Sequence, residues 1–204
     1  MMATAALYPS SADAFRAQGI EYIWHMTHIA HLDSIKRTGL LSHNAVRRLG
    51  YLKQNISDPD VQTRRAANEP VYGRSMHDYV PFFVNPKNAM LFTLRASQRD
   101  VCILGVSINV LNETEHLFTN GNAACRDTVF SNDAADVSAL PWDVLRAPGW
   151  NQFTDGKRYR AAEVMLPNCV PAGQVNVIHL YDRTHIRQAA GYGVRLVVNS
   201  DWYF

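Results

Sequence analysis

The sequence contains little that would indicate a zinc knuckle, a disulfide framework or a membrane span. Its three cysteines are odd in number and far apart, and none belongs to a CxxC pair. No apolar run approaches the roughly 20 residues that a membrane span requires. The N-terminal segment MMATAALYPSSADAF lacks a basic region and a long apolar region, so we expect no signal peptide. These absences favour a protein of the reducing cytoplasm.

Charge and glycine-rich loops are also scarce. The formal net charge is only +2 and charged residues make up 19% of the chain, so any basic surface has to be local. Neither GxGxxG nor GxxxxGK[ST] occurs, which excludes the Rossmann and P-loop phosphate sites, and no GxSxG motif marks a nucleophile. What the chain does have is 47% hydrophobic residues among 204, enough to bury one core.

Strand and helix patterns interleave without the regular spacing of βαβ units. We expect strands in the following segments: 21–27, 79–84, 100–110, 158–167, 174–182 and 194–204. A helix is expected from Ile29 to the glycine stop at Gly39, and shorter helices follow residues 85–88 and lie near residues 142–147 and 183–191. The pattern favours the α+β class over a doubly wound sheet.

Histidines crowd the stretch WHMTHIAHLDSIKRTGLLSHN, residues 24–44. It contains four of the eight histidines: His25, His28, His31 and His43. The spacing resembles a metal site, but no carboxylate stands where a zinc-binding helix needs one, so a metal is disfavoured. Strand alternation places His25 on the same face as Thr27, which makes the two either a satisfied core detail or part of a polar ligand site. We interpret His28 and His31 as bystanders at the start of a helix.

A carboxylate stands inside the apolar strand RYRAAEVMLP. Glu163 follows Ala161 and Ala162, two small residues that leave space beside it. A buried carboxylate is costly unless it is paired or used, so Glu163 is either part of an ion pair with an arginine or a functional group. The arginine-rich segment 47–74 would suit phosphates, although such a run is more often a solvated surface.

These residues together resemble a known family. The ordered motifs HMTHIAHLDSIKRTGLLSHN, DVQTRR, MHDYVPFFVNPKNAMLF, TNGNAA, YRAAEVML and WYF are similar to those of the DarT family of DNA ADP-ribosyltransferase toxins. The resemblance runs from about residue 21 to residue 204, which implies one domain over 21–204 and an N-terminal extension over 1–20. It implies an ADP-ribosyltransferase fold with a split, strongly bent central β-structure and flanking helices.

The resemblance also implies an activity and partners. The expected reaction is the NAD-dependent attachment of ADP-ribose to a base of single-stranded DNA in the cytoplasm, with NAD⁺ as co-substrate and without a metal. The expected protein partner is a macrodomain antitoxin of the DarG type, which removes ADP-ribose from DNA. Family members modify thymidine or guanosine, and the terminal WYF with the overall motif order favours thymidine.

Residue roles can be carried over from the family motifs. The His-x-Thr motif that contacts NAD⁺ corresponds to residues 25–27, that is His25, Met26 and Thr27. Further NAD⁺ contacts correspond to Ser34 and Ser42.

The catalytic glutamate and the catalytic arginine of the family have counterparts in later segments of this chain. Its catalytic glutamate matches Glu163, and its catalytic arginine matches Arg64 or Arg65, a choice that the sequence leaves open. The segment that closes over NAD⁺ corresponds to residues 50–65, and the loop that approaches the DNA base to residues 117–163.

Single-stranded DNA would be held by basic and aromatic side chains, since single-strand binders combine the two. The candidates in the long loop are Phe130, Trp142, Trp150, Phe153, Arg126, Arg146, Lys157 and Arg158. Of these, Trp142 is the one that we expect to lie in the core. Lys87 and Asn88 replace the Arg and Ser often found in the family, which puts a family-type DNA contact there in doubt.

Other functions stay open at this point. An ADP-ribosyltransferase acting on RNA or protein, or an NAD⁺ glycohydrolase, would share the NAD⁺ site and differ in the target loop. A non-enzymatic nucleic-acid-binding domain would leave Glu163 unexplained and would be more basic. A metal-dependent hydrolase would require ligands that the histidine spacing does not provide.

Overall fold

An eight-stranded sheet dominates the computed structural model, which describes residues 10–51, 56 and 59–204. Neighbouring strands are antiparallel, except that β10 and β9 are parallel. In spatial order the strands are β10 (Arg195–Val198), β9 (Val175–Leu180), β4 (Val101–Ser107), β1 (Tyr22–His28), β3 (Tyr79–Phe83), β7 (Glu163–Pro167), β5 (Leu117–Thr119) and β6 (Phe130–Ser131). A small second sheet pairs β2 (Leu40–Leu41) with β8 (Cys169–Val170).

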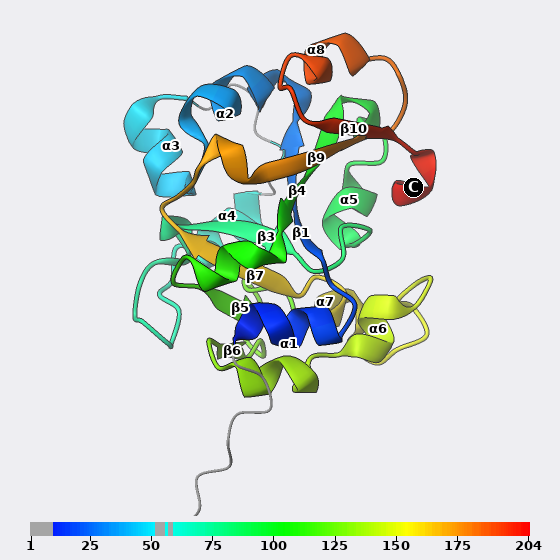
Figure 1. The fold of residues 1–204 in the computed structure, drawn as a ribbon. Coiled ribbons are helices and arrows are strands. Elements are labelled where there is room, and N and C mark those ends of the chain that lie inside the picture. Colours follow the sequence, from blue (N-terminus) through cyan, green and yellow to red (C-terminus); the bar gives the residue numbers. More distant parts are fainter. Residues whose placement is uncertain (1–9, 52–55, 57–58) are drawn as a thin grey trace, which may run out of the picture.

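Short helices surround the large sheet. They are α1 (Ser11–Ala17), α2 (Leu32–Thr38), α3 (His43–Leu49), α4 (Pro59–Arg65), α5 (Ala89–Thr93), α6 (Trp142–Arg146), α7 (Gly156–Tyr159) and α8 (Ile186–Ala190). Figure 1 shows α2, α3 and α8 around the end of the molecule that holds β9 and β10, and α1, α6 and α7 around the end that holds β5 and β6. The α+β class predicted from the sequence is confirmed.

The sheet is split between β1 and β3. Strand β1 pairs with β4 along its whole length, but it meets β3 at a single register pair, Trp24 with Phe83. Proline at position 81 has no N–H to donate to a β-ladder, and its carbonyl instead accepts a hydrogen bond from the side chain of His25. Strands β3 and β7 consequently run across β1 and β4 rather than alongside them (Figure 1).

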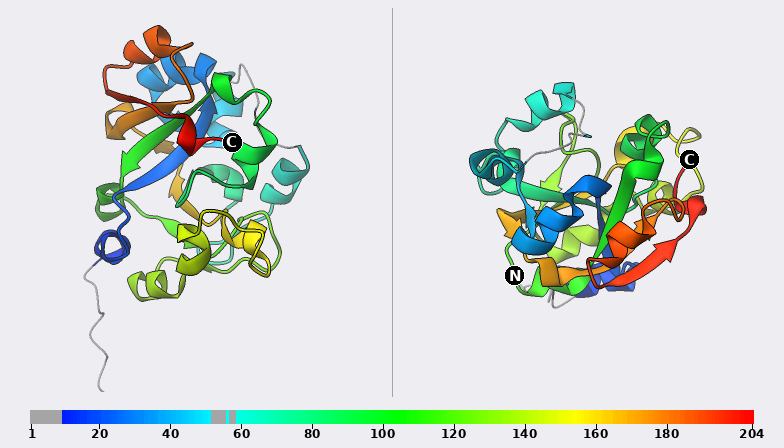
Figure 2. Two further views of the ribbon diagram at one scale, coloured as in Figure 1. Left: turned by 90° about the vertical axis from the view of Figure 1, so that its right-hand side faces the viewer. Right: turned by 90° about the horizontal axis from the view of Figure 1, so that it is seen from above.

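One hydrophobic core joins the two halves of the sheet. Phe15 of α1 is fully buried and packs edge-on against Phe118 and Trp142, with ring centroids 5.6 and 6.1 Å apart. Trp142 is therefore a core residue, as expected. Residues 11–17 pack into the same core as the rest of the chain, and Figure 2 shows α1 against the lower part of the sheet. The domain boundary after residue 20 stays a prediction.

The predicted strands all have counterparts in the structure, as do the helices at α2, α5, α6 and α8. The sequence did not predict α1, α3, α4 or α7. Residues 44–80 look polar and irregular, and the strand expected over 158–167 begins only at Glu163, after α7. The ends of α3 nevertheless follow sequence rules: Ser42 caps its start, and Gly50 ends it with a φ of 66°.

All three cysteines are free. Among the helices described, none has the length and apolarity to cross a membrane.

His179 of β9 is a buried histidine of the sheet. Its ring stacks on Trp202 with centroids 3.8 Å apart, and its Nδ1 is buried without a partner in the described part of the chain. Burial, with a smaller effect of the positive charge of Arg195, lowers the pKa of His179 to about 4. The unfolded chain takes up this proton near pH 6.5, so the folded state loses stability as the pH falls from about 6.5 towards 4.

Replacing His179 with phenylalanine keeps an aromatic ring against Trp202 and removes the titrating group. Between about pH 7 and pH 5, unfolding of the wild type is coupled to the uptake of about one proton by His179. The free energy of unfolding should therefore fall less over this range in His179→Phe than in the wild type. Denaturant unfolding at both pH values measures the difference. The same comparison between about pH 8 and pH 9 is the control, because His179 is neutral in both states there. An equal fall in the two proteins at acid pH contradicts the assigned pKa.

Candidate active site

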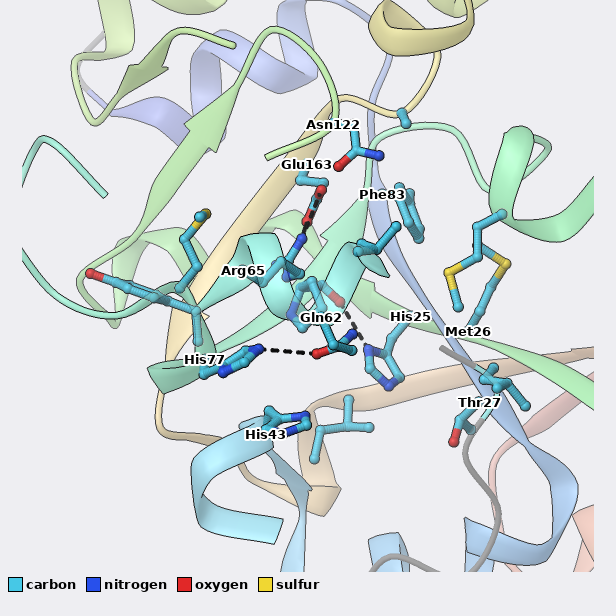
Figure 3. Close-up of a pocket in the computed structure, with 18 of the residues that line it drawn as sticks. His25, Met26, Thr27, His43, Gln62, Arg65, His77, Phe83, Asn122 and Glu163 are labelled. Carbon is cyan, nitrogen blue, oxygen red and sulfur yellow. Dashed lines mark hydrogen bonds and ion pairs between the residues drawn. The ribbon is translucent and has the colours of Figure 1, made fainter. Parts of the chain in front are cut away.

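A cavity of about 670 Å³ lies where β1 and β3 diverge. Side chains of β1, β3 and β7 line it together with those of α2, α3, α4 and α5 (Figure 3). The residues singled out from the sequence that line it are His25, Met26, Thr27, His31, Ser34, His43, Arg64, Arg65, Lys157, Arg158 and Glu163. Its volume is within the range of about 300–1,000 Å³ that is typical of ligand sites.

Glu163 and Arg65 form a buried ion pair in this cavity. Glu163 begins β7 and is 1% exposed, while Arg65 ends α4 and is 7% exposed. Nη1 of Arg65 donates to both carboxylate oxygens of Glu163, at 3.1 and 2.9 Å. The backbone N–H of Ala123 donates to Oε1 of the same carboxylate at 2.9 Å. Of the two possibilities left open by the sequence, the structure shows the ion pair, and the functional role of Glu163 stays a prediction. The carboxylate also faces a ligand-sized cavity (Figure 3).

The two neighbouring arginines occupy different environments. Arg65 is buried, and its Nη2 is a buried donor with no partner among the residues described. Arg64 is exposed, although it also lines the cavity. An unpaired buried donor is costly, so Arg65 Nη2 is suited to a ligand that brings an acceptor. Of the two arginines, Arg65 is the one that pairs with Glu163.

His25 faces the cavity as a neutral hydrogen-bond acceptor. Its Nδ1 lies 2.8 Å from the carbonyl oxygen of Pro81. Because a carbonyl only accepts, Nδ1 carries the proton, and Nε2 is left with a lone pair. Burial is the main cause that lowers the pKa of His25, and the positive charge that His31 can carry lowers it further. The imidazole is therefore neutral at physiological pH.

The other residues near His25 in the histidine-rich stretch differ in whether they line the cavity. Thr27 lines the cavity, and its hydroxyl lies 3.0 Å from Nδ1 of His31, which lines the cavity as well. His31 is thus part of the site and not the bystander that we expected. His28 does behave as expected, because its ring accepts from the backbone N–H of Ala30 at the start of a helical turn. Met26 packs in a hydrophobic cluster beside the cavity.

The two serines have mainly structural hydrogen bonds. Ser34 lines the cavity, but its hydroxyl donates to the carbonyl of His31 at 2.8 Å. Ser42 is fully buried, accepts from the N–H of Ala45 and does not line the cavity. The structure therefore brings Ser34 to the ligand site and leaves Ser42 as a helix cap. Of the closing segment 50–65, residues 52–55 and 57–58 lie outside the described residues.

A stacked histidine pair in this cavity was not predicted from the sequence. The rings of His43 and His77 stack with centroids 4.2 Å apart, and Nε2 of His77 lies 3.1 Å from Oε1 of Gln62. Burial lowers the pKa of both histidines, and the positive charge of Arg65 lowers both further. Gln62 lies on α4 less than one turn before Arg65, so the pair helps to hold the arginine-bearing helix. His43 and His77 are 34 positions apart (77 − 43), and no local pattern links them.

A second buried carboxylate supports the segment after α4. Glu69 is 1% exposed and accepts hydrogen bonds from the backbone N–H groups of Val71, Tyr72 and Arg74 and from the hydroxyl of Tyr79. Burial alone would raise the pKa of Glu69, but these hydrogen bonds outweigh it and lower the pKa. With its acceptors occupied, Glu69 fixes the turn that follows Arg65 and is not available for chemistry.

The long segment 117–163 contributes Asn122, Arg158 and Glu163 to the cavity wall. Arg158 is held by Asp155, Asn120 and Thr128, so its position is fixed. No group of three or more His, Cys, Asp or Glu side chains in residues 10–51, 56 and 59–204 is arranged to hold a metal ion.

Comparison with solved structures shows which known fold the chain has. The fold superposes on Thermus sp. 2.9 DarT in complex with ADP-ribosylated ssDNA with a TM-score of 0.82, at 23% identity, covering 91% of this chain and 97% of that one. It matches Thermosipho africanus DarTG in complex with ADP-ribose with a TM-score of 0.81, at 21% identity, over 90% of this chain and 51% of that one. The split sheet is thus the fold of an ADP-ribosyltransferase, as the sequence predicted.

Comparison of sequences gives the family. Residues 24–204 match the family model described as ssDNA thymidine ADP-ribosyltransferase, DarT. A DNA ADP-ribosyl transferase of Thermus aquaticus is 29% identical over 184 residues, which are 82% of this chain and 80% of that protein. A DNA ADP-ribosyl transferase-DNA ADP-ribosyl glycohydrolase fusion protein of Thermosipho africanus is 24% identical over 165 residues, 78% of this chain and 42% of that protein. The chain belongs to the DarT family, and the family predicted from its motifs is confirmed.

Proposed function

We propose that this chain transfers ADP-ribose from NAD⁺ to a thymidine base in single-stranded DNA. The observation that carries the proposal is the buried Glu163–Arg65 pair in a ligand-sized cavity of a chain that matches the DarT family over residues 24–204. Structures of Thermus sp. 2.9 DarT with NAD⁺ share the fold, with a TM-score of 0.77. The family description names thymidine, which supports the choice of base.

The cavity fits NAD⁺ as a co-substrate. The buried Nη2 of Arg65 needs an acceptor, which a phosphate oxygen or a carbonyl of the ligands provides. The lone pair on Nε2 of His25 needs a donor, which the carboxamide of nicotinamide provides. Thr27 and His31 add a polar pair beside it. Met26 and Phe83 offer apolar surface on the same side of the cavity for an aromatic ring (Figure 3).

The reaction breaks the bond between the nicotinamide nitrogen and C1′ of its ribose. The transition state resembles an oxocarbenium ion, and nicotinamide leaves as a neutral molecule. A new bond forms between C1′ and a nitrogen of the base. In thymidine one ring N–H is left after the glycosidic bond, so that nitrogen loses its proton as the bond forms.

Glu163 is placed to assist this reaction. A fixed carboxylate next to the ribose stabilises the positive charge that develops there, and it can also accept the proton from the base. Arg65 and the N–H of Ala123 hold the carboxylate in one orientation, so little reorganisation is needed during the reaction. Arg65 and Glu163 are the catalytic residues of this proposal, and His25, Met26, Thr27 and Ser34 line the NAD⁺ site.

The proposed product also defines a partner. The Thermosipho africanus protein joins a DNA ADP-ribosyl transferase to a DNA ADP-ribosyl glycohydrolase, which supports pairing of this chain with a macrodomain antitoxin of the DarG type. In this arrangement the chain is the toxin and the glycohydrolase reverses its product. Because NAD⁺ is a soluble co-substrate of the cytoplasm, we place the activity there.

Single-stranded oligonucleotides that differ in one base test the substrate. The wild type is incubated with NAD⁺ and each oligonucleotide, and intact mass spectrometry detects one added ADP-ribosyl group. We expect the adduct with the thymidine oligonucleotide and not with the adenosine, cytidine or guanosine variants. An adduct on guanosine would replace the base assignment, an adduct only on RNA would overturn the DNA assignment, and NAD⁺ hydrolysis without adduct would make the chain a glycohydrolase.

A further inference from the structure

Aromatic and basic side chains gather on the outer face of α5. Phe92 and Phe204 are 43% and 37% exposed, and their rings meet edge to face with centroids 5.2 Å apart. Trp150 packs edge-on against Phe204 at 5.8 Å. The guanidinium of Arg95 lies 4.4 Å from the centre of the Phe92 ring, and Nζ of Lys87 lies 5.2 Å from that of Phe204. We call Lys87, Phe92, Arg95, Trp150 and Phe204 the α5 patch.

The rings of the α5 patch are held in place by the backbone around them. The side-chain amide of Gln98 accepts from the N–H of Phe204 at 2.9 Å and donates to its carbonyl oxygen. Asn88 caps α5 by accepting from the N–H groups of Met90 and Leu91. The exposed rings are thus presented on a fixed frame, which lowers the entropy lost when a flat ligand stacks on them.

The positive charges of the α5 patch are not neutralised within the described part of the chain. Nζ of Lys87 donates to the backbone carbonyl of Asp201, and Arg95 donates to that of Phe92, but neither cation takes part in an ion pair there. By contrast, the neighbouring exposed Arg99 pairs with Asp182. Two unneutralised cations beside exposed rings suit a ligand with both phosphates and flat bases.

The α5 patch is continuous with the wall of the cavity. Ala89, Met90 and Thr93 of α5 line the cavity, whereas Phe92 belongs to the outer face. Both views in Figure 2 place residue 204 beside α5. The cavity wall and the α5 patch thus share one helix.

We propose that the α5 patch binds nucleotides that flank the modified base. Bases stack on Phe92 and Phe204, and phosphates lie near Lys87 and Arg95. Stacking on an aromatic face accepts any base, so the patch adds affinity for longer single strands without adding sequence preference. This inference rests on the proposed function, because single-stranded DNA is the occupant.

Fluorescence anisotropy with labelled single-stranded oligonucleotides tests the patch directly. For an oligonucleotide of about ten nucleotides, each of Phe92→Ala and Phe204→Ala should raise the Kd about tenfold, as loss of a stacking platform does. For a short oligonucleotide that fills only the cavity, the ratio of mutant to wild-type Kd should be close to one. The Arg95→Ala variant should reduce the slope of log Kd against log salt by about 0.7, the value for one phosphate contact on a single strand.

Matched controls separate the patch from general surface effects. Arg187→Ala removes an exposed arginine from α8, which Figure 1 shows apart from α5, and Val198→Ser removes an exposed apolar side chain from β10. Neither should change the Kd or the salt slope. Equal Kd values for the long oligonucleotide in Phe92→Ala, Phe204→Ala and the wild type, with thermal unfolding unchanged, would overturn the proposal.

The same experiment separates this inference from the proposed function. Binding is read without NAD⁺, so the patch can be judged even if no ADP-ribose is transferred. If the wild type transfers ADP-ribose and the variants bind the long oligonucleotide normally, the α5 patch is wrong and the proposed function stands. If the variants lose affinity and no transfer occurs with any base, the α5 patch is supported and the proposed function is wrong.

Discussion

Glu163→Gln should lower the rate of ADP-ribose transfer by about a hundredfold to a thousandfold, the usual effect of removing one group that stabilises transition-state charge. Glutamine has nearly the same shape and can still accept the hydrogen bond from Ala123, but it carries no negative charge. The positive charge that develops on the ribose then lacks its counter-charge. Single-turnover transfer to a thymidine oligonucleotide at saturating NAD⁺ measures the effect.

Two controls make this result specific. Glu115→Gln removes an exposed glutamate whose partner is Arg74, and it should leave transfer unchanged. Removing one partner of a buried ion pair can destabilise a protein, so thermal unfolding and NAD⁺ binding of Glu163→Gln are measured as well. A folded Glu163→Gln variant that binds NAD⁺ and transfers ADP-ribose at the wild-type rate would rule out a catalytic role for Glu163.

Arg65→Ala should also reduce transfer by about a hundredfold or more, because it removes both the partner of Glu163 and the buried donor Nη2. Arg65→Lys keeps a positive charge near Glu163 but has no planar fork, so it should restore only part of the activity. Arg64→Ala should have a much smaller effect, since Arg64 is exposed. The values of kcat and KM for both substrates separate loss of catalysis from loss of binding.

The adjacent arginine makes this comparison well controlled. Arg64 and Arg65 lie on the same helix, so helix propensity and overall charge change equally in the two alanine variants. If Arg64→Ala lost as much activity as Arg65→Ala, the assignment of the site arginine to position 65 would be wrong.

Rules that depend on neighbouring residues in the sequence predicted much of the site. A carboxylate in an apolar strand next to two alanines marked Glu163, and strand alternation joined His25 to Thr27. The choice between Arg64 and Arg65 was not visible, because it depends on which side of α4 faces β7. That helix was itself missed, since its few turns carry mostly polar residues and only Arg65 is buried.

Long-range contacts explain the rest of what the sequence did not predict. His43, Gln62 and His77 come from three separate elements and meet only in the folded protein. His31 looked like an exposed helix residue, yet the preceding turn directs it towards Thr27. The α5 patch joins Phe92 to Phe204 across more than half of the chain, and no local pattern connects them.

The amounts of nicotinamide released and of ADP-ribosyl-thymidine formed in one reaction show whether the chain couples NAD⁺ cleavage to thymidine modification through Glu163. The wild type is incubated with NAD⁺ and a single-stranded thymidine oligonucleotide, the DNA is digested to nucleosides, and both products are quantified by mass spectrometry. We expect equal amounts of the two products in the wild type and neither product above background in Glu163→Gln. Nicotinamide without modified thymidine, or equal yields from Glu163→Gln and the wild type, would contradict this expectation.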